Sequence, residues 1–571
     1  MGKSASSFLF NEAVLFHESG ALHEAVRRYQ EVLRADPTHG EAARLLGTAY
    51  AQQGRFADAV ALFRKAVKRA PRDPILQNLL GESLRLSGAP EEALKYFHRA
   101  LFLKPHFAEA HANRGNALAA LDRHDEAIAS FESALAKRGN FAEVHINRGN
   151  SLRSLDRLEE AAASYQRAIA IRSDLAEAHF SLGLARDDQN RPEEAIESLD
   201  RALALGLFQT EPTLRARVFA RRAHLQDLRG HFGAAQADMA RSLALAPDDD
   251  EVLYSVSFID LLHGAWPEGW RKFERRISLE AGLPGRTPAS FPPWQGEPLP
   301  NELLVLGGER GLGDQIQFCS FAADLAKRGF RVAVVANPHL VPLLKTVPGV
   351  ERVISDVNAL RATEARFAHM MSVPHILHTT PESLPQVAPF LSAGAERAAA
   401  WRTRLGTQGF KIGITWQGNP SYRRDKGRSV PLESFAPLAE IPAVRLISLQ
   451  KRPGSEQIAA VDFRDRIETP LPDSQIDSDA VLDSAAVLAN LDLVVSSDTM
   501  IPHLAGALGR PTFVALRNVP DWRWLIGRDD CPWYPSLRLF RQPAPGDWTS
   551  VFHRIAEAVR QLAAARSPDG A

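Results

Sequence analysis

The apolar residues in the first half of the chain recur with a period of 34 residues from Ser6 onward. Within each period the spacing of small and apolar residues fits the faces of two successive helices. The pattern predicts a row of seven or eight helix hairpins, from an opening unit at 6–39 to a closing unit at about 250–281. The clearest unit, residues 40–73, has Leu46, Gly47 and Tyr50 on its first helix and Ala59, Phe63 and Ala66 on its second.

A helix hairpin of 34 residues has the length of a tetratricopeptide repeat, and the chain resembles that repeat through this pattern. Glycine and alanine are expected where two helices cross closely, and an aromatic residue is expected to fill the gap between hairpins. Stacked repeats of this kind form an α-solenoid, which the sequence predicts for residues 1–282. The concave groove of such a solenoid suits an extended peptide.

Four asparagines stand at two equivalent positions of neighbouring repeats, Asn113 and Asn116 in one and Asn147 and Asn150 in the next. An amide both donates and accepts hydrogen bonds, so it can pair with a peptide backbone of any sequence. The positions resemble the asparagine ladder in the repeat array of O-GlcNAc transferase, which implies that they bind an acceptor protein or peptide. The alternative is that they are solvated polar residues on a helix face.

A linker rich in proline and glycine is predicted at 283–300, and the pattern then changes to alternating strands and helices. The stretch that begins at Glu302 has an apolar run at Leu303–Leu306, followed by a glycine-rich turn, a helix and a second strand at Arg331–Val335. The glycine spacing matches neither the dinucleotide fingerprint nor an ATP P-loop. These elements predict a first Rossmann-like half at 301–395. Asp314, at the start of its helix, is either a helix cap or a general base.

A second Rossmann-like half is predicted for residues 396–571. Its elements are a strand from Lys411 that ends in a turn, a strand at 444–450, a helix at 483–490 and an apolar strand at 491–495. Two such halves in tandem describe the GT-B architecture, so the predicted fold is an α-solenoid followed by an α/β GT-B module. Basic residues follow the turn of the first strand: Arg423, Arg424, Lys426 and Arg428.

The sequence Ser496-Ser-Asp-Thr499 lies between the last of these strands and a helix predicted at 501–508. At that place its hydroxyls, its backbone N–H groups and the positive end of the helix dipole could bind an anion. In an open α/β sheet, ligands bind at this edge. The alternative is that these residues only cap the helix. His503, one turn further on, favours the ligand-binding interpretation.

Several motifs together resemble the bacterial tetratricopeptide-fused glycosyltransferases, whose catalytic half is similar to the ADP-heptose heptosyltransferases. Some of these fusions resemble the enzymes that glycosylate flagellin. The matching segments are 308–318, 371–374, 413–420, 428–429, 448–450, 497–499 with 503–506, and 521–524 with 533–534.

The resemblance implies roles for individual residues. Asp314 stands in a Leu-Gly-Asp turn whose aspartate is the proposed general base, and Arg428 stands where the family has a phosphate-binding lysine. Asp498, Thr499 and His503 match a donor-binding motif in which Met500 replaces a glycine. The implied donor-binding residues are Thr415, Gly418, Arg428, Ser429, Gln450, Ser497, Asp498, Thr499 and His503.

No metal or cofactor is predicted, and the nucleotide sugar enters as a co-substrate. Asp477-Ser-Asp479 spells the metal-binding motif of another transferase class, but it precedes a helix and is interpreted as a cap. Helix dipoles and arginine would neutralise the leaving diphosphate instead. Trp522, Trp524, Trp533 and Tyr534 are expected to pack between domains, with stacking on a base or sugar as the alternative.

Charge and cysteine content narrow the partners and the compartment. The 68 basic and 68 acidic residues balance, which argues against a general nucleic-acid or anionic-membrane surface. No run is long enough for an integral membrane segment, and no signal-peptide core is present at the N-terminus. Cys319 and Cys531 have no metal or redox spacing, which is typical of a reduced cytoplasmic protein.

The sequence therefore predicts a metal-independent glycosyltransferase, inverting or retaining, that moves a sugar to hydroxyl groups of a protein held by the repeat array. Flagellin is one possible acceptor, and a homodimer is one possible assembly. Two alternatives stay open. One is a transferase of the heptosyltransferase type that acts on lipopolysaccharide or another glycan, and the other is a repeat adaptor with a degenerate, inactive transferase fold.

Overall fold

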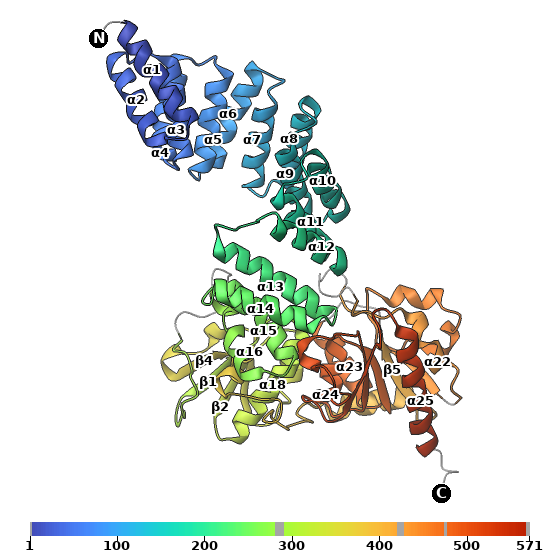
Figure 1. The fold of residues 1–571 in the computed structure, drawn as a ribbon. Coiled ribbons are helices and arrows are strands. Elements are labelled where there is room, and N and C mark those ends of the chain that lie inside the picture. The colour runs from blue at the N-terminus through green and yellow to red at the C-terminus, as the bar shows by residue number, and fades with distance from the viewer. Residues whose placement is uncertain (1–2, 280–290, 420–426, 443, 473–476, 567–571) are drawn as a thin grey trace. The chain divides into compact units, whose positions relative to one another are not determined.

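A computed structural model describes residues 3–279, 291–419, 427–442, 444–472 and 477–566. It divides into two compact units, residues 1–208 and residues 209–571 (Figure 1). The division falls just after the sixth helix hairpin. The last two hairpins therefore belong to the same compact unit as the sheets, although the repeat pattern extends to about residue 281.

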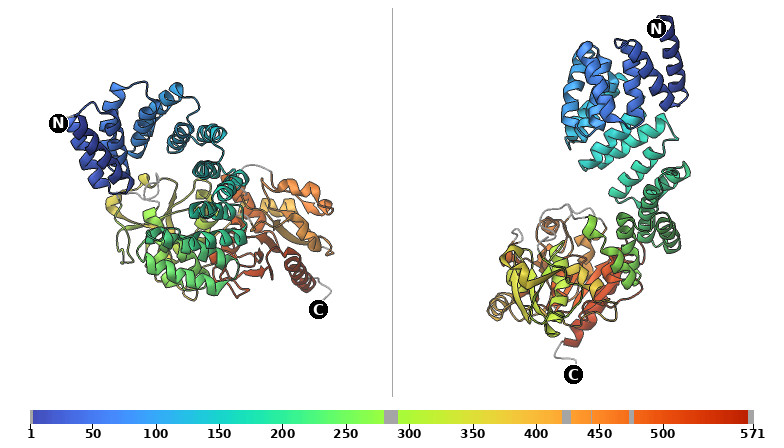
Figure 2. Two further views of the ribbon diagram at one scale, coloured as in Figure 1. Left: turned by 45° about the horizontal axis from the view of Figure 1, so that its top comes forward. Right: turned by 90° about the vertical axis from the view of Figure 1, so that its left-hand side faces the viewer.

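The first unit consists of six helix hairpins that stack in chain order, each against the next (Figure 2). They agree with the hairpins predicted from the 34-residue period. The helices are α1 Lys3–Glu18, α2 Leu22–Ala35, α3 Gly40–Gln52, α4 Phe56–Arg69, α5 Pro74–Leu86, α6 Pro90–Leu103, α7 Ala108–Ala119, α8 His124–Lys137, α9 Ala142–Ser154, α10 Leu158–Ile171, α11 Ala176–Asp188 and α12 Pro192–Ala204.

A glycine under an aromatic ring holds each of the four middle hairpins together. The ring on the second helix lies over the glycine on the first helix of the same hairpin, so the ring fills the hairpin's own interior. A Cβ atom added to Gly115, for example, would lie 2.5 Å from Cε1 of Phe131. The four pairs are Gly47 with Phe63, Gly81 with Phe97, Gly115 with Phe131 and Gly149 with Tyr165.

We expect Gly115→Ala to destabilise its hairpin by about 1–3 kcal/mol, because overpacking forces the buried ring and the helix apart. Gly40→Ala is the matched control, since Gly40 begins α3 with no atom within 4 Å of the added Cβ. That control should be neutral or slightly stabilising. Hydrogen-exchange mass spectrometry of peptides from α7 and α8 measures the effect. Equal protection in both variants would contradict the expectation.

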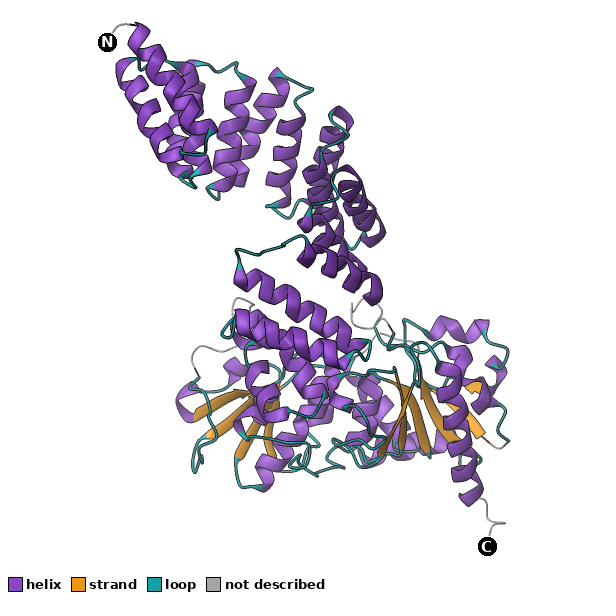
Figure 3. Cartoon of the chain, in the orientation of Figure 1, coloured by secondary structure: helices purple, strands orange, loops and turns teal. Residues whose placement is uncertain are grey.

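The second unit begins with the helices α13 Pro212–Leu228, α14 Phe232–Leu245, α15 Asp250–Leu262, α16 Trp266–Phe273 and α17 Arg276–Leu279. The pairs α13–α14 and α15–α16 are the last two hairpins, which brings the described hairpins to eight. Two sheets follow these helices, and Figure 3 shows their strands as two separate groups in orange.

The first sheet has four parallel strands in the order β3-β2-β1-β4. Part of the predicted linker lies along its edge, where Pro293 bridges to Phe367 and the Trp294 N–H donates to the Phe367 carbonyl at 2.8 Å. The elements of this region are β1 Leu303–Gly307, α18 Leu312–Lys327, β2 Arg331–Val335, α19 Val341–Leu344, β3 Val350–Ile354, β4 Ala365–His369, α20 Val373–Ile376 and α21 Ala395–Leu405.

The second sheet has six parallel strands in the order β10-β9-β8-β5-β6-β7. Counted from β5, this is the strand order of a doubly wound sheet. Helix α23 begins five residues earlier than predicted because Asp477 caps it, accepting the Ala480 N–H. The elements are β5 Phe410–Thr415, α22 Ala436–Ala439, β6 Val444–Ser448, β7 Ile467–Glu468, α23 Ser478–Leu488, β8 Leu493–Ser497, α24 Met500–Ala507, β9 Thr512–Leu516, β10 Leu537–Arg541 and α25 Trp548–Arg566.

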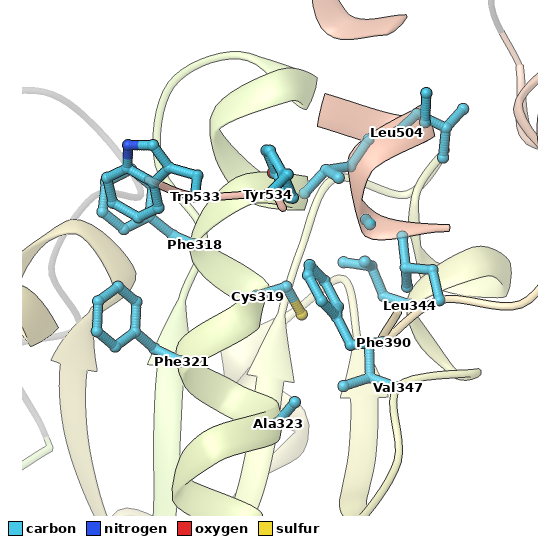
Figure 4. Close-up of a cluster of buried hydrophobic side chains, with 14 of the residues drawn as sticks. Phe318, Cys319, Phe321, Ala323, Leu344, Val347, Phe390, Leu504, Trp533 and Tyr534 are labelled. Carbon is cyan, nitrogen blue, oxygen red and sulfur yellow. The ribbon is translucent and has the colours of Figure 1, made fainter. Parts of the chain in front are cut away.

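One hydrophobic core joins the last hairpin and parts of both sheets. Phe318 and Phe321 on α18 pack beside Trp533, with Tyr534 and Leu504 from the second sheet's side (Figure 4). Trp533 also packs against Trp266 of α16, with ring centroids 5.5 Å apart. Trp533 and Tyr534 therefore pack as predicted, and Trp522 packs against Trp270 while it also lines the pocket described below.

Candidate functional site

A pocket of about 880 Å³ opens where the strands of both sheets end. Its lining includes the residues that follow β1 and β4 in the first sheet and those that follow β5, β6 and β8 in the second. In each sheet the strand order reverses direction at one pair of neighbours, β1 and β4 in the first sheet and β5 and β8 in the second. Such switch points are where open α/β sheets bind ligands. The pocket therefore lies at the switch points of both sheets, with Phe258 and Phe273 of the last hairpin in its wall.

The glycine-rich turn after β1 places Asp314 in the pocket. Asp314 is the third residue of α18, and its carboxylate accepts the Gly311 N–H at 3.0 Å. The predicted capping role is thus present. The same carboxylate forms an ion pair with Arg523, which lies more than 200 residues further along the chain. The side chain of Asp314 is 21% exposed, so it can still reach a ligand.

The turns after β5 and β6 are joined by Gln450. Its side-chain oxygen accepts from the Thr415 hydroxyl at 3.0 Å and from the Gln417 N–H at 3.0 Å. Its amide nitrogen lies 2.9–3.0 Å from the carbonyl oxygens of Gln417, Lys451 and Pro453, which share its two N–H donors. Gln450 therefore holds the two loops together. It does so partly through Thr415, which sequence analysis, like Gln450 itself, assigned to donor binding.

Helix α24 begins at the pocket with Thr499 as its N-cap, whose hydroxyl oxygen accepts the Ile501 N–H at 3.4 Å. Arg428 reaches the same place and donates from Nε to the Asp498 carbonyl at 3.2 Å. The eight-residue helix therefore presents its positive end beside a guanidinium group. Both features favour an anion at this end of the pocket.

His503 is a buried, neutral histidine in the pocket wall, with only 5% of its surface exposed. Its ring is stacked on Trp524 at a centroid distance of 5.3 Å. Burial, together with the nearby Arg523 guanidinium, lowers the pKa of His503 to about 4. At neutral pH the imidazole can accept one hydrogen bond and donate another, but it adds no charge for a phosphate.

Arg523 also lines the pocket, and sequence analysis did not identify it as a site residue. It donates to Asp314, to Asp521 at 2.7 Å and to the Gln317 side-chain oxygen at 3.0 Å. Burial alone would raise the pKa of Asp521, but the Arg523 and Arg428 guanidinium groups outweigh it and lower that pKa to about 2. The only signal in the sequence was the matching segment 521–524. Sequence analysis interpreted the two tryptophans of this segment and gave no role to the arginine between them.

The charges around the pocket favour an anionic ligand although the whole chain is neutral. Five cationic side chains line it against three acidic ones. They are Arg310, Arg428, Lys451, Arg452 and Arg523 against Asp314, Asp498 and Asp521.

The structure brings most of the predicted catalytic and donor-binding residues together in this pocket. Ser429 and Ser497 are the exceptions. The Ser429 hydroxyl accepts the Gly418 N–H at 3.2 Å behind the lining, and Ser497 is fully buried in β8. Arg423, Arg424 and Lys426 lie outside the described residues. The predicted residues that do line the pocket are Asp314, Thr415, Gly418, Arg428, Gln450, Asp498, Thr499 and His503.

Comparison with known proteins identifies the helical repeats. Family models described as tetratricopeptide or TPR repeats match residues 16–82, 78–143, 149–187 and 176–205. The array in the first unit therefore consists of tetratricopeptide repeats. A curated relative, protein FlbA of Caulobacter vibrioides, is 30% identical over 373 residues, which cover 61% of this chain and 61% of FlbA. The chain thus spans about three fifths of the length of that relative.

Two of three similar solved structures are described as TPR proteins. The Cut9–Hcn1 hetero-tetramer of the APC/C is 17% identical, covering 48% of this chain and 53% of the other, with a TM-score of 0.38. YrrB, a TPR protein with an unusual peptide-binding site, is 22% identical over 34% of this chain and 96% of its own, with a TM-score of 0.29. TTC0263 of Thermus thermophilus is 24% identical, covering 32% of this chain and 98% of its own, with a TM-score of 0.29. Each of these structures covers less than half of this chain, with a TM-score below 0.4.

The four asparagines of the tetratricopeptide array form contacts between and within repeats. Asn147 donates to the Asn116 side-chain oxygen at 2.9 Å, and Asn113 donates to Asn78 at 3.2 Å. The Asn150 oxygen accepts from the Tyr165 hydroxyl at 2.8 Å. Sequence analysis missed Asn78, which stands one position away from the ladder's register. Each amide keeps further hydrogen-bonding capacity, because an asparagine has two N–H donors and two acceptor lone pairs.

Among the described residues, no helix is both long and apolar enough to cross a membrane. Within the same residues, no cluster of three or more His, Cys, Asp or Glu side chains has a metal-binding arrangement. Asp477 caps α23 as predicted, and Asp479 pairs with Arg397.

Proposed function

We propose that the chain is a glycosyltransferase of the GT-B type that moves a sugar from a nucleotide-sugar donor to hydroxyl groups of a protein held by the repeat array. The observation that carries the proposal is the pocket at the switch points of two parallel sheets, with an anion-binding end and a carboxylate end. A transferase needs these two functions in one cavity, since the leaving diphosphate is anionic and the acceptor hydroxyl must lose a proton.

The second sheet supplies the donor side in this proposal. The diphosphate lies at the positive end of α24, where Thr499 and Arg428 stabilise the charge that develops as the glycosidic bond breaks. An arginine can bind phosphate oxygens in bidentate fashion. The base of the nucleotide extends towards the loop after β6 that Gln450 organises. No metal is needed for this step.

The first sheet and the array supply the acceptor side. Asp314 takes the proton from the acceptor hydroxyl, and the sugar lies between this carboxylate and the phosphate site. The asparagines of the array hold the acceptor's backbone through their remaining hydrogen-bonding capacity. We propose residues 1–282 as the array, 283–300 as a linker, 301–395 as the acceptor half and 396–571 as the donor half, with flagellin as a candidate acceptor in the cytoplasm and a homodimer as a candidate assembly.

A thermal-shift screen of the full chain against UDP, GDP, ADP, CMP and their common sugars tests this function. We expect one nucleotide family to stabilise the protein by about 2.7 kcal/mol at a hundredfold excess over its Kd. Wild-type protein with the corresponding sugar donor should then add the mass of one sugar to an acceptor protein, measured by mass spectrometry.

Other outcomes of these experiments would replace the proposal. Binding of a nucleotide sugar with added mass only on lipid extracts would favour a transferase for lipopolysaccharide or another glycan. No stabilisation by any nucleotide would favour a repeat adaptor that has lost its chemistry.

A further inference from the structure

Arg523 connects the two ends of the pocket. It lies in the short turn Trp522–Trp524 of the second sheet's side, and its side chain is only 13% exposed. Its guanidinium stacks on the Trp522 ring at 4.3 Å and bonds to Asp521, which begins the same turn. Gln317 and Asp314, both from α18, accept two further hydrogen bonds. The arginine is therefore held in one orientation from both sides of the pocket.

This arginine keeps hydrogen-bonding capacity for a ligand. A guanidinium has five N–H donors. Three of them serve Gln317, Asp521 and Asp314, one from Nε and one from each terminal nitrogen. The two that remain have no acceptor among the described residues, and the side chain lines the pocket. A buried cationic donor with spare N–H groups is suited to an oxyanion, because charge-assisted hydrogen bonds are the stronger ones.

The charged neighbours of Arg523 show where it lies between the two ends of the pocket. Asp498 and Asp521 contribute to the electrostatics of Arg523, and Arg428 contributes to those of Asp521. The charges thus alternate from Arg428, whose side chain reaches the beginning of α24, to Asp314 in the first turn of α18. Arg523 stands between the anion end and the carboxylate.

We propose that Arg523 binds a terminal phosphate oxygen of the nucleoside diphosphate with its two remaining N–H donors while it holds the Asp314 carboxylate. The inference rests on the proposed function and adds a ligand-binding and positioning residue to it. One guanidinium then sets the separation between the leaving phosphate and Asp314. The carboxylate and the phosphate share the same positive charge, so neutralising the carboxylate strengthens phosphate binding.

Titration calorimetry on the full chain tests this, with the nucleoside diphosphate that stabilises the wild type most and the matching monophosphate as probes. We expect Arg523→Lys to weaken diphosphate binding by roughly tenfold or more, because a lysine cannot reproduce the forked contacts. Monophosphate binding should change less than about threefold, since the terminal phosphate is absent. A merely structural role would weaken both probes alike.

Asp314→Asn provides a second test that leaves Arg523 in place. It should tighten diphosphate binding several-fold, and this gain should vanish when Arg523→Lys is also present. Arg528→Lys is the matched control, because Arg528 also pairs with an aspartate, Asp530, but does not line the pocket. It should leave both affinities unchanged.

The outcomes separate the two proposals. Wild-type protein that binds no nucleotide would overturn the proposed function and this inference together. Normal wild-type binding with an unchanged diphosphate affinity in Arg523→Lys would overturn the inference alone. An Asp314→Asn gain that persists in the double variant would also overturn it, because the effect would then be general electrostatic attraction that does not pass through Arg523.

Discussion

Asp314→Asn is expected to lower the rate of sugar transfer by about 10²–10⁴-fold, the usual contribution of a positioned general base. Asparagine keeps the size of the side chain and an oxygen that can accept the Gly311 N–H. It cannot take a proton from an acceptor hydroxyl. Transfer is measured as mass gained by the acceptor protein at saturating donor, with the donor chosen by the thermal-shift screen.

The control for this prediction is Asp324→Asn on the same helix. Asp324 pairs with Arg328 and does not line the pocket, so transfer should stay at the wild-type rate. Both variants must bind nucleotide, which calorimetry verifies. If Asp314→Asn transferred sugar within about threefold of wild type while unfolding at the same temperature, Asp314 would not be the base.

The repeat array could be predicted from the sequence because each hairpin is a local structure. The residues that close a hairpin, such as Gly115 and Phe131, are 16 positions apart, and the pattern recurs at a fixed period. The parallel strands were also predictable, since fully buried strands are short apolar runs with turn residues after them. β2 has the predicted bounds, and β8 begins two residues later than predicted.

The site was predictable only where its chemistry follows directly from a strand end. Thr499 and Asp314 stand at such places, but the ion pair between Asp314 and Arg523 joins segments more than 200 residues apart. No local pattern specifies such a contact. The position of Gln450 was predicted and its surroundings were not, because its partners are the Thr415 hydroxyl and backbone groups of two loops, those after β5 and β6. The start of α23 was predicted at 483 although Asp477 was interpreted as a cap, and the helix in fact begins directly after that cap, at Ser478.

The largest effect on stability is expected from Arg276→Ala. Arg276 is 1% exposed and donates to both carboxylate oxygens of Glu309 at 3.0 Å, and it also bonds to Ser372 at 2.8 Å. Burial alone would raise the pKa of Glu309, but Arg276 outweighs it and lowers that pKa. Glu309 stands at the start of the glycine-rich turn and also accepts the Met371 N–H at 3.1 Å. The ion pair therefore ties the helix after the last hairpin to the turn that carries Asp314.

Removing Arg276 leaves a buried carboxylate without its cation, so we expect the second unit to lose about 3–5 kcal/mol of unfolding free energy. Urea unfolding followed by tryptophan fluorescence measures this directly, because all nine tryptophans lie in residues 209–571. Arg271→Ala breaks the exposed pair with Glu268 and should cost at most about 1 kcal/mol. The double variant Arg276→Met, Glu309→Leu should recover much of the loss, since apolar groups of similar size can replace a buried ion pair. A loss in Arg276→Ala no larger than that of Arg271→Ala would show that water reaches Glu309 and that the turn is held by its other contacts.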